Sequence, residues 1–440
     1  MDTQNYFPEP AKKPNIPVPA GMNLVWNHST GRWAFRPVSG YSTVYLKKDS
    51  FIPKRQETNT NTSNVTGKTQ KSSLDSAKKA KNDEFYTRLE DITNELKHYK
   101  EHFQGKTVYC PCDKAFNLGR SNFVQFFIEH FVDWGIKKLV ATQYNEDGRG
   151  WKWVVERGDV NGNGYIDESE IDTYQLYGNG DFASDECRQI MKECDIVVTN
   201  PPFSLFRQFV AQIMEFGKKF LIIGNMNAIT YKEIFPLIKD NKMWLGFTAP
   251  KVFEVPLDKV EDEKKQFEED GKVYQKFGNI LWYTNLVHSK RLDGIYCPAR
   301  YKGREDKYPV YDNYDAIEIG HYTRNGKWEG SLDELPSDYD GYMGVPITFL
   351  GQYSPEQFEI VGLLQSSTEE EAGIPILRTY NDFLEMRQDM SFTGASGGKA
   401  NGNPVITGKP VSGNFLYNKE TGEYVHSVYA RILIRRKKAN

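Results

Sequence analysis

The sequence predicts an α/β fold in which helices cover both faces of a doubly wound, mostly parallel β-sheet. From residue 83 onward, segments with helical apolar spacing alternate with short apolar runs of strand length. These runs are continuous in Val, Ile, Leu and Phe, as expected for strands that are buried on both faces. At 440 residues, the chain is long enough for two or three domains with a substantial core.

The alternating region begins with a predicted helix over residues 89–103, whose apolar side chains recur at helical spacing, and a strand at 107–110. The following elements, in chain order, are a helix at 123–134, a strand at 138–141, a helix at 186–193, a strand at 196–199, a helix at 205–216, a strand at 220–223 and a helix at 231–239. Folds of this kind bind ligands outside the carboxyl ends of their strands.

The segment before this region, residues 1–72, is predicted to be an appendage. It contains a small hairpin with its turn at 29–31, and residues 56–73 form a linker that is too polar to build a core.

Beyond residue 246 the pattern becomes irregular, aromatic and rich in turns. Strands are expected at 279–284, 343–350 and 429–434, and a mobile Gly-rich loop at 394–408. We therefore expect three units, which are an appendage at 1–72, a central domain at 73–246 with an insertion at 148–175, and a C-terminal region at 247–440.

Composition indicates a soluble protein of a reducing compartment. No apolar run approaches the length of a membrane span, and the N-terminus lacks the basic and apolar blocks of a signal peptide, so we expect a cytoplasmic location without a membrane partner. Five cysteines, an odd number spread over a long chain, suit free thiols. The net charge of −3 does not indicate nucleic acid, and the basic clusters at 78–81, 137–138 and 431–438 are either phosphate contacts or solvated faces.

The most informative motif is the run at 195–203, where a short apolar strand leads into Asn200, Pro201, Pro202 and Phe203. Two prolines fix the backbone of this turn. The Asn200 side-chain oxygen and the Pro201 carbonyl can accept both hydrogens of a planar amine, and Phe203 offers a face for a base. The turn therefore predicts a site for an extruded adenine. The structural alternative is an Asn-capped turn that merely starts the next helix.

The chemistry that fits this turn is transfer of a methyl group from S-adenosylmethionine, an in-line displacement that requires alignment more than a general base. An adenine amine is paired inside a duplex, so the base must first flip out, and stacking on Phe203 offsets part of that cost.

The cofactor is expected at the end of the strand at 107–110, where Cys110, Cys112 and Asp113 replace the Gly-x-Gly turn of most methyltransferases. Asp113 is predicted to hold the cofactor's ammonium, and Ser121 and Asn122, which start the next helix, its carboxylate. Zinc is not expected there, because no second Cys or His pair lies at ligand spacing.

Two further segments complete the predicted cofactor site. Phe85, Tyr86 and Thr87 precede the first helix, where an ordinary helix cap is the alternative. Asp181 is predicted to accept a hydrogen bond from the cofactor's adenine amine while Phe182 packs on its ring.

In the order and content of these motifs, the chain resembles the EcoRI-type family of adenine-specific DNA methyltransferases. The resemblance covers residues 77–366 and the final strand at 431–436. Its matching segments are 81–87, 108–113, 121–123, 180–182, 195–206, 220–235, 244–246, 311–317 and 344–350.

The resemblance implies a Rossmann-like, S-adenosylmethionine-dependent fold, with the central domain as the catalytic domain and the C-terminal region as the target-recognition region. It implies double-stranded DNA as partner and a place in restriction and modification. The same chemistry on RNA or on a protein amide is the first alternative, and a catalytically silent nucleic-acid-binding protein of the same fold is the second.

Within the insertion, residues 159–170 fit the twelve-residue calcium loop. Oxygen ligands are expected from Asp159, Asn161, Asn163, Tyr165, Asp167 and Glu170. A calcium ion bound here would have a structural role. The alternative is an Asn-Gly turn in a β-hairpin, because helices do not clearly flank the loop.

Overall fold

The computed structural model describes residues 85–113, 121–146, 148–255, 260, 266–322, 328–329, 332–365 and 371–438, together with the backbone of 22–27, 32–37 and 44–45. In the N-terminal part, β1 (Met22–Asn27) and β2 (Arg32–Pro37) pair antiparallel, and β3 (Val44–Tyr45) joins β2. The predicted hairpin is therefore confirmed. The polar linker at 56–73 and the basic cluster at 78–81 lie outside the described residues.

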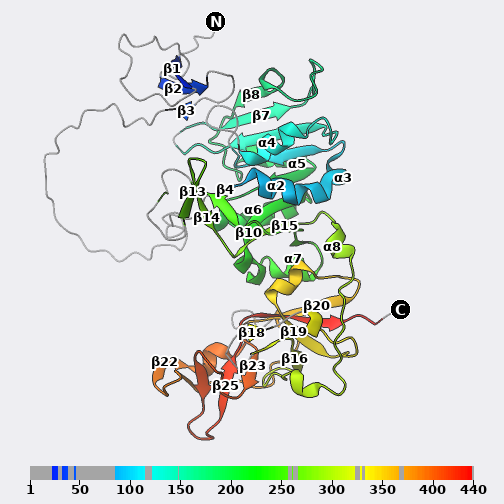
Figure 1. Ribbon diagram of the computed structural model, residues 1–440, viewed down its shortest axis with the longest axis vertical. Helices are drawn as coiled ribbons and strands as arrows, with labels where there is room; N and C mark the ends of the chain where they lie inside the picture. The colour runs from blue at the N-terminus through cyan, green and yellow to red at the C-terminus, as the bar shows by residue number, and fades with distance from the viewer. Residues whose placement is uncertain are drawn as a thin grey trace, which may run out of the picture.

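An eight-stranded sheet forms the centre of the molecule (Figure 1). Its strands, in spatial order, are β11 (Trp244–Leu245), β15 (Ile280–Thr284), β10 (Lys219–Asn225), β9 (Ile196–Thr199), β5 (Thr107–Cys110), β6 (Lys138–Gln143), β7 (Trp151–Val155) and β8 (Asp172–Gln175).

The sheet is mixed, so the expectation of a mostly parallel sheet is wrong at its two sides. Strands β10, β9, β5 and β6 run parallel to one another. On one side β15 pairs antiparallel with both β10 and β11, and on the other β7 and β8 form an antiparallel extension. The domain division at residue 246 stays a prediction, although β15, which follows that residue in the chain, belongs to this sheet.

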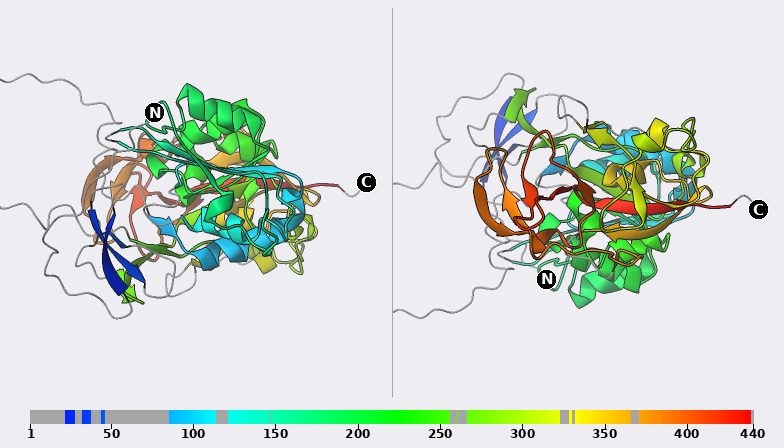
Figure 2. Two further views of the ribbon diagram at one scale, coloured as in Figure 1. Left: turned by 90° about the horizontal axis from the view of Figure 1, so that it is seen from above. Right: turned by 90° about the horizontal axis from the view of Figure 1, so that it is seen from below.

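Helices cover both faces of the sheet, as predicted (Figure 2). One face packs against α2 (Leu89–Leu96), α3 (Lys100–Phe103) and α4 (Asn122–Glu129), and the other against α5 (Asp185–Glu193), α6 (Phe206–Glu215) and α7 (Phe235–Lys239). Successive strand residues alternate between the faces, since Val108 packs on the first side and Tyr109 on the second. No helix in the described ranges is long and apolar enough to cross a membrane.

Three predicted helices differ from their expected extents. The predicted helix over 123–134 ends at Glu129, the last residue of α4. The predicted helix over 89–103 is divided by a 3-10 turn at Lys97–Tyr99. The predicted helix over 231–239 begins only at Phe235, because Pro236 lies at its first turn, where the missing N–H is harmless.

A small sheet lies beside the central one. It consists of β13 (Gln266–Glu269), β14 (Lys272–Lys276), β12 (Val252–Glu254) and β4 (Tyr86–Thr87). Because β4 pairs with β12, the segment before the first helix is tied to the region after residue 246.

The C-terminal part begins with the short helix α8 (Ser289–Leu292), which lies to the side of the central sheet in Figure 1. It contains three more sheets, which lie below the central sheet in that view. One sheet has the order β16 (Ala316–Glu318), β19 (Tyr342–Pro346), β26 (Arg431–Arg436), β20 (Phe358–Leu364), and β17 (His321–Tyr322) pairs with β18 (Trp328–Glu329). A five-stranded sheet follows the order β22 (Phe392–Ser396), β21 (Leu384–Met386), β24 (Phe415–Tyr417), β25 (Tyr424–Ser427), β23 (Val405–Thr407).

Two expectations for this part are wrong. The Gly-rich segment at 394–408 is not a mobile loop, because it includes β22, a 3-10 turn and β23. A Cβ on Gly397 would lie 2.4 Å from the carbonyl oxygen of Tyr380, so this glycine permits close packing. The predicted strand at 343–350 ends at Pro346, which cannot donate to a ladder, and continues as a 3-10 helix.

A buried ion pair connects two strands of the C-terminal part. Arg431 Nε donates to Glu318 Oε1 at 2.8 Å, and both side chains are buried. On the same strand, Arg435 donates to Glu359 at 2.6 Å, but that pair is exposed. The buried pair is therefore the one whose loss leaves an uncompensated charge inside the protein.

Candidate active site

The predicted catalytic and cofactor turns follow neighbouring parallel strands. In the register of the sheet, Val108 of β5 lies opposite Ile196 of β9, and Tyr109 opposite Val197. Both strands therefore end at the same edge of the sheet, and the turn after β5 meets the turn after β9. This is the edge at which α/β folds bind ligands.

Asn200 is the first residue after β9, and its side chain is held in one orientation. Its Nδ2 donates to the backbone carbonyl of Phe85 at 2.8 Å. A carbonyl oxygen can only accept, so this bond fixes which end of the amide is the nitrogen. The other end, Oδ1, is buried and has no hydrogen-bond partner among the described residues. A buried acceptor of this kind is costly unless a ligand supplies a donor.

The rest of the turn is rigid and partly enclosed. Pro201 is buried, and Pro202 has φ −54° and ψ 127°, an extended conformation that ends the turn. Phe203 opens a 3-10 turn that leads into α6, and it is partly buried against the core on the α2 side of the sheet. The predicted helix start after the turn is thus confirmed. The Asn200 side chain does not cap it, because its amide donates to Phe85 and the N-cap residue of the 3-10 turn is Pro202.

Asp113 lies in the turn after β5 and is 6% exposed. Thr199, the last residue of β9, bonds through its hydroxyl to Asp113 Oδ2 at 2.8 Å and to the Pro111 carbonyl at 2.5 Å. Burial raises the pKa of the Asp113 carboxyl to about 7, although hydrogen bonds from Ser121 and Thr199 act to lower it. The two turns are therefore joined by buried side chains.

The cysteines of the cofactor turn have different surroundings. Cys110 is the last residue of β5, and its side chain is fully buried in the core. Cys112 is partly buried and has φ 65°, the left-handed conformation that glycine adopts most readily. The chain thus makes at Cys112 the bend for which other sequences use glycine, which explains how the turn forms without a Gly-x-Gly motif.

The segment at 85–87 bridges the catalytic turn and α4. While the Phe85 carbonyl accepts from Asn200, the Thr87 carbonyl accepts from Asn122 Nδ2 at 2.6 Å. Thr87 Oγ1 is buried and has no partner within the described part of the chain. Ser121 is the N-cap of α4 and accepts from the Val124 N–H. Four predicted cofactor residues, Phe85, Thr87, Ser121 and Asn122, are thus brought together; Tyr86 lies between two of them in β4.

The loop carrying Asp181 and Phe182 reaches the same edge of the sheet. Gly180 has φ 82°, and a Cβ there would lie 2.2 Å from the Gln143 carbonyl, so the loop lies directly on the end of β6. Asp181 is exposed and accepts from the Ala183 N–H at 2.9 Å. Phe182 is buried and packs edge-on against Phe209, so its ring belongs to the core.

Comparison with known proteins agrees with this geometry. The model of the family described as "Adenine-specific methyltransferase EcoRI" matches residues 73–437. The chain belongs to this family. It is similar to the Type II methyltransferase M.EcoRI of Escherichia coli, with 40% identity over 318 residues that cover 68% of this chain and 92% of the relative. No solved structure matches it.

Two mycoplasma relatives give the same assignment. The Type II methyltransferase M.MpnI of Mycoplasma pneumoniae is 41% identical over 293 residues, covering 66% of this chain and 84% of the relative. The Type II methyltransferase M.MgeORF184P of Mycoplasma genitalium is 37% identical over 317 residues, covering 71% and 91%. This chain is therefore a family member that is longer than these relatives, and it is an adenine-specific methyltransferase.

The predicted calcium loop at 159–170 connects β7 and β8, so strands and not helices flank it. Asp159 accepts from three backbone N–H groups of the loop, and buried Glu170 accepts from three others. The side-chain amides of Asn161 and Asn163 both donate to Asp167. Across the described residues, no group of three or more His, Cys, Asp or Glu is arranged to hold a metal ion. The hairpin alternative describes the topology, and calcium binding stays a prediction.

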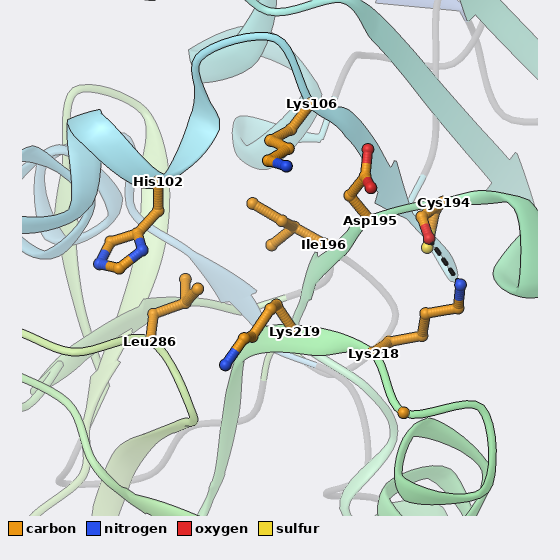
Figure 3. A pocket seen from close by; sticks show the side chains of 9 residues that line it. His102, Lys106, Cys194, Asp195, Ile196, Lys218, Lys219 and Leu286 are labelled. Atoms are coloured by element: carbon orange, nitrogen blue, oxygen red, sulfur yellow. Dashed lines mark hydrogen bonds between the residues drawn. The ribbon is translucent and has the colours of Figure 1, made fainter.

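A cavity of about 340 Å³ is lined by residues such as Lys106, Asp195 and Lys219 (Figure 3). These residues lie at the starts of β5, β9 and β10, so the cavity is at the opposite edge of the sheet from the turn at Asn200. It opens beside the amino ends of β5, β9 and β10 and contains three lysines. Lys218 Nζ donates to the carbonyls of Lys192 and Cys194, at 2.6 and 2.8 Å, and Lys219 Nζ donates to the Asn285 carbonyl. These lysines complete the hydrogen bonding of chain segments at this edge, so the cavity has no part in the candidate site.

Sequence reasoning missed one residue of the site, Thr199. Its hydroxyl joins both turns, but in the sequence it is only the last residue of a buried strand. A threonine that directly precedes the predicted catalytic Asn200 is a signal, since a buried hydroxyl at a strand end requires partners.

Proposed function

We propose that the chain transfers a methyl group to the exocyclic amine of an adenine flipped out of double-stranded DNA, with the turn at Asn200 to Phe203 as its catalytic element. The observation that carries this proposal is the buried Oδ1 of Asn200, which has no partner among the described residues, beside an Nδ2 that is already bound to Phe85. Such an atom is an acceptor aimed at a donor from outside the protein, and the adenine amine has two donor hydrogens.

The chemistry follows from hydrogen bonding at the amine. Its lone pair is delocalised into the ring, so the nitrogen is a poor nucleophile. Hydrogen bonds from its two N–H groups to Asn200 Oδ1 and the Pro201 carbonyl favour a more tetrahedral nitrogen with a localised lone pair. The fixed orientation of Asn200 provides this stabilisation without reorganisation, as preorganised dipoles do. Phe203 supplies the stacking face for the extruded base.

The residues around the cofactor turn fit S-adenosylmethionine, which supplies an electrophilic methyl group on sulfonium. Asp113 would hold the ammonium, because a buried carboxyl with a raised pKa gains most from a cation. Ser121 and Asn122, at the first turn of α4, would hold the carboxylate. Phe85 to Thr87 and the loop of Asp181 and Phe182 flank the same edge, and Cys110 and Cys112 shape the turn.

Target recognition would come from the C-terminal region. Tyr296 and Tyr429 are exposed there, and basic residues follow β26. Aromatic side chains and cations are the groups that stack on bases and contact phosphates. A cytoplasmic location suits a DNA-modifying enzyme of this kind.

The test is expression in cells that lack DNA methylation, followed by mapping of modified adenines across the genome. We expect methylation at one short sequence with the natural chain and a much smaller methylated fraction with the matched variant Asn200→Ala at equal expression, with folding checked by thermal melting. An unmodified genome together with methylated RNA would assign the chain to the RNA alternative instead.

A further inference from the structure

The Thr199 hydroxyl sits between two oxygens that both ordinarily accept hydrogen bonds. Its Oγ1 lies 2.5 Å from the Pro111 carbonyl and 2.8 Å from Asp113 Oδ2, and Thr199 is fully buried. A hydroxyl carries one hydrogen and can donate to only one of them. Both contacts are satisfied when Asp113 carries a proton and donates it to Thr199, while Thr199 donates to Pro111.

The groups that face Asp113 come from every neighbouring element. Cys110 of β5 is a buried thiol, Ser121 of α4 and Thr199 of β9 contribute hydroxyls, and the Thr142 carbonyl of β6 accepts the Asp113 N–H at 3.0 Å. Within the described ranges, the groups that shift the pKa of Asp113 are neutral hydroxyls and not cations. Burial of this carboxyl favours the protonated acid near neutral pH.

We propose that Asp113 holds a proton in the free protein and releases it when the ammonium of the cofactor binds, and that Thr199 is the positioning residue that transmits this change to Asn200. The inference rests on the proposed function, because it takes S-adenosylmethionine as the source of the ammonium. The O–H bond of the Asp113 acid breaks, its proton passes to solvent, and the ammonium keeps its own protons. The Thr199 hydrogen then turns from Pro111 to the new carboxylate.

Thr199 directly precedes Asn200, so a hydroxyl that changes partner acts on the strand end that carries the catalytic amide. With the cofactor bound, Thr199 ties the end of β9, and with it the backbone that carries Asn200, to the charged Asp113. The catalytic turn is thereby coupled to cofactor occupancy by a single side chain.

The sign of the pH dependence follows from a raised pKa. Below about pH 7 the free protein carries the proton, so binding requires its release, and cofactor affinity falls as pH falls. Between pH 5.5 and 7 an α-amino group stays protonated, with its own pKa at about 7.7 to 8.0. In that range the cofactor therefore contributes no proton of its own.

The experiment is isothermal titration calorimetry of the full chain with S-adenosylmethionine, without DNA, in two buffers of different ionisation enthalpy. We expect release of close to one proton per bound cofactor at the acidic end of this range, decreasing as pH rises through about 7. Asp113→Asn should bind weakly and release none. Thr199→Val should move the release curve to higher pH, because it loses a hydrogen bond that lowers the pKa of Asp113, whereas Thr199→Ser should restore the natural curve.

Methyl-transfer kinetics complete the test, since Thr199→Val should lower kcat more than it raises KM for DNA. Natural chain that binds without releasing a proton would overturn the proposal, as would a Thr199→Val curve that superimposes on the natural one. If Thr199→Val does not fold, the number of protons released by the natural chain and by Asp113→Asn still tests whether Asp113 is the group that loses the proton. Absence of cofactor binding and methyl transfer in the natural chain would refute the proposed function itself, a separate result.

Discussion

Replacement of Asn200 by Ala removes two hydrogen bonds with different consequences. The lost donor leaves the Phe85 carbonyl, 2.8 Å away, without its partner, which we expect to cost about 1–3 kcal/mol of stability. The lost acceptor is the preorganised Oδ1, and removing one such group typically lowers kcat by about 10²–10³, or roughly 2.7–4 kcal/mol of transition-state stabilisation. The loss of transition-state stabilisation should therefore exceed the loss of folding stability by about 1 kcal/mol or more.

The assay is single-turnover transfer of labelled methyl from S-adenosylmethionine to duplex DNA, with melting temperature measured in parallel. Asn200→Asp is the matched variant, because it keeps an acceptor toward the amine but places a second acceptor against the Phe85 carbonyl. We expect it to react faster than Asn200→Ala while melting below the natural chain. A rate for Asn200→Ala within threefold of the natural chain, at saturating cofactor and DNA, would refute the role given to Oδ1.

Three further predictions concern the scaffold. Cys112→Gly should melt higher than Cys112→Ala by the equivalent of about 1–2 kcal/mol, because φ 65° is strained for any residue with a Cβ; equal melting would show that the turn is unstrained. Arg431→Met should lower the free energy of unfolding in denaturant by about 3–5 kcal/mol, because it leaves the buried Glu318 carboxylate without its cation. The control Arg435→Met, on the same strand but in an exposed pair, should lower it by less than about 1 kcal/mol. Similar losses for the two variants would contradict this prediction. If the loop at 159–170 binds calcium, millimolar Ca²⁺ should raise the melting temperature of the natural chain but not of Glu170→Gln. An unchanged melting temperature of the natural chain would contradict calcium binding.

The centre of the fold could be predicted because its strands are marked by their own residues. Runs such as 196–199 and 220–223 are apolar throughout, since both faces of β9 and β10 are covered, and a strand of that kind is recognisable without its neighbours. The helices between them follow from apolar spacing in the same way.

The direction of the outer strands could not be predicted. Whether β15 runs parallel or antiparallel to β10 depends on the path of the chain between them, through α7 and the small sheet, and not on residues 280–284 themselves. The early end of β19 and the late start of the predicted helix at 231–239 had a visible cause, since Pro346 and Pro236 mark the two boundaries. The prediction of a mobile loop at 394–408 was wrong because Gly397 allows the backbone to pack closely against Tyr380. The sequence alone does not distinguish a glycine used for close packing from one in a mobile loop.

The candidate site was predictable in its parts but not in their connections. The turn at 200–203 and the positions of Asp113 and Ser121 follow from motif order along the chain. The bonds from Asn200 to Phe85 and from Thr199 to Asp113 join residues more than 80 positions apart. The second depends on the register of β5 with β9, and the first on β4, which holds the segment of Phe85 through its pairing with β12. Register between distant strands is a tertiary property, so neither bond could be derived from sequence.

The central claim is that this chain methylates adenine in DNA at the turn that begins with Asn200. The most direct measurement is incubation of the purified chain with labelled S-adenosylmethionine and equal masses of unmethylated genomic DNA or RNA, followed by digestion to nucleosides and their identification by mass spectrometry. We expect label in N6-methyldeoxyadenosine from DNA, formed at least about 100-fold more slowly with Asn200→Ala. Label only in RNA or in another nucleoside, or equal label with the Asn200→Ala variant, would contradict it.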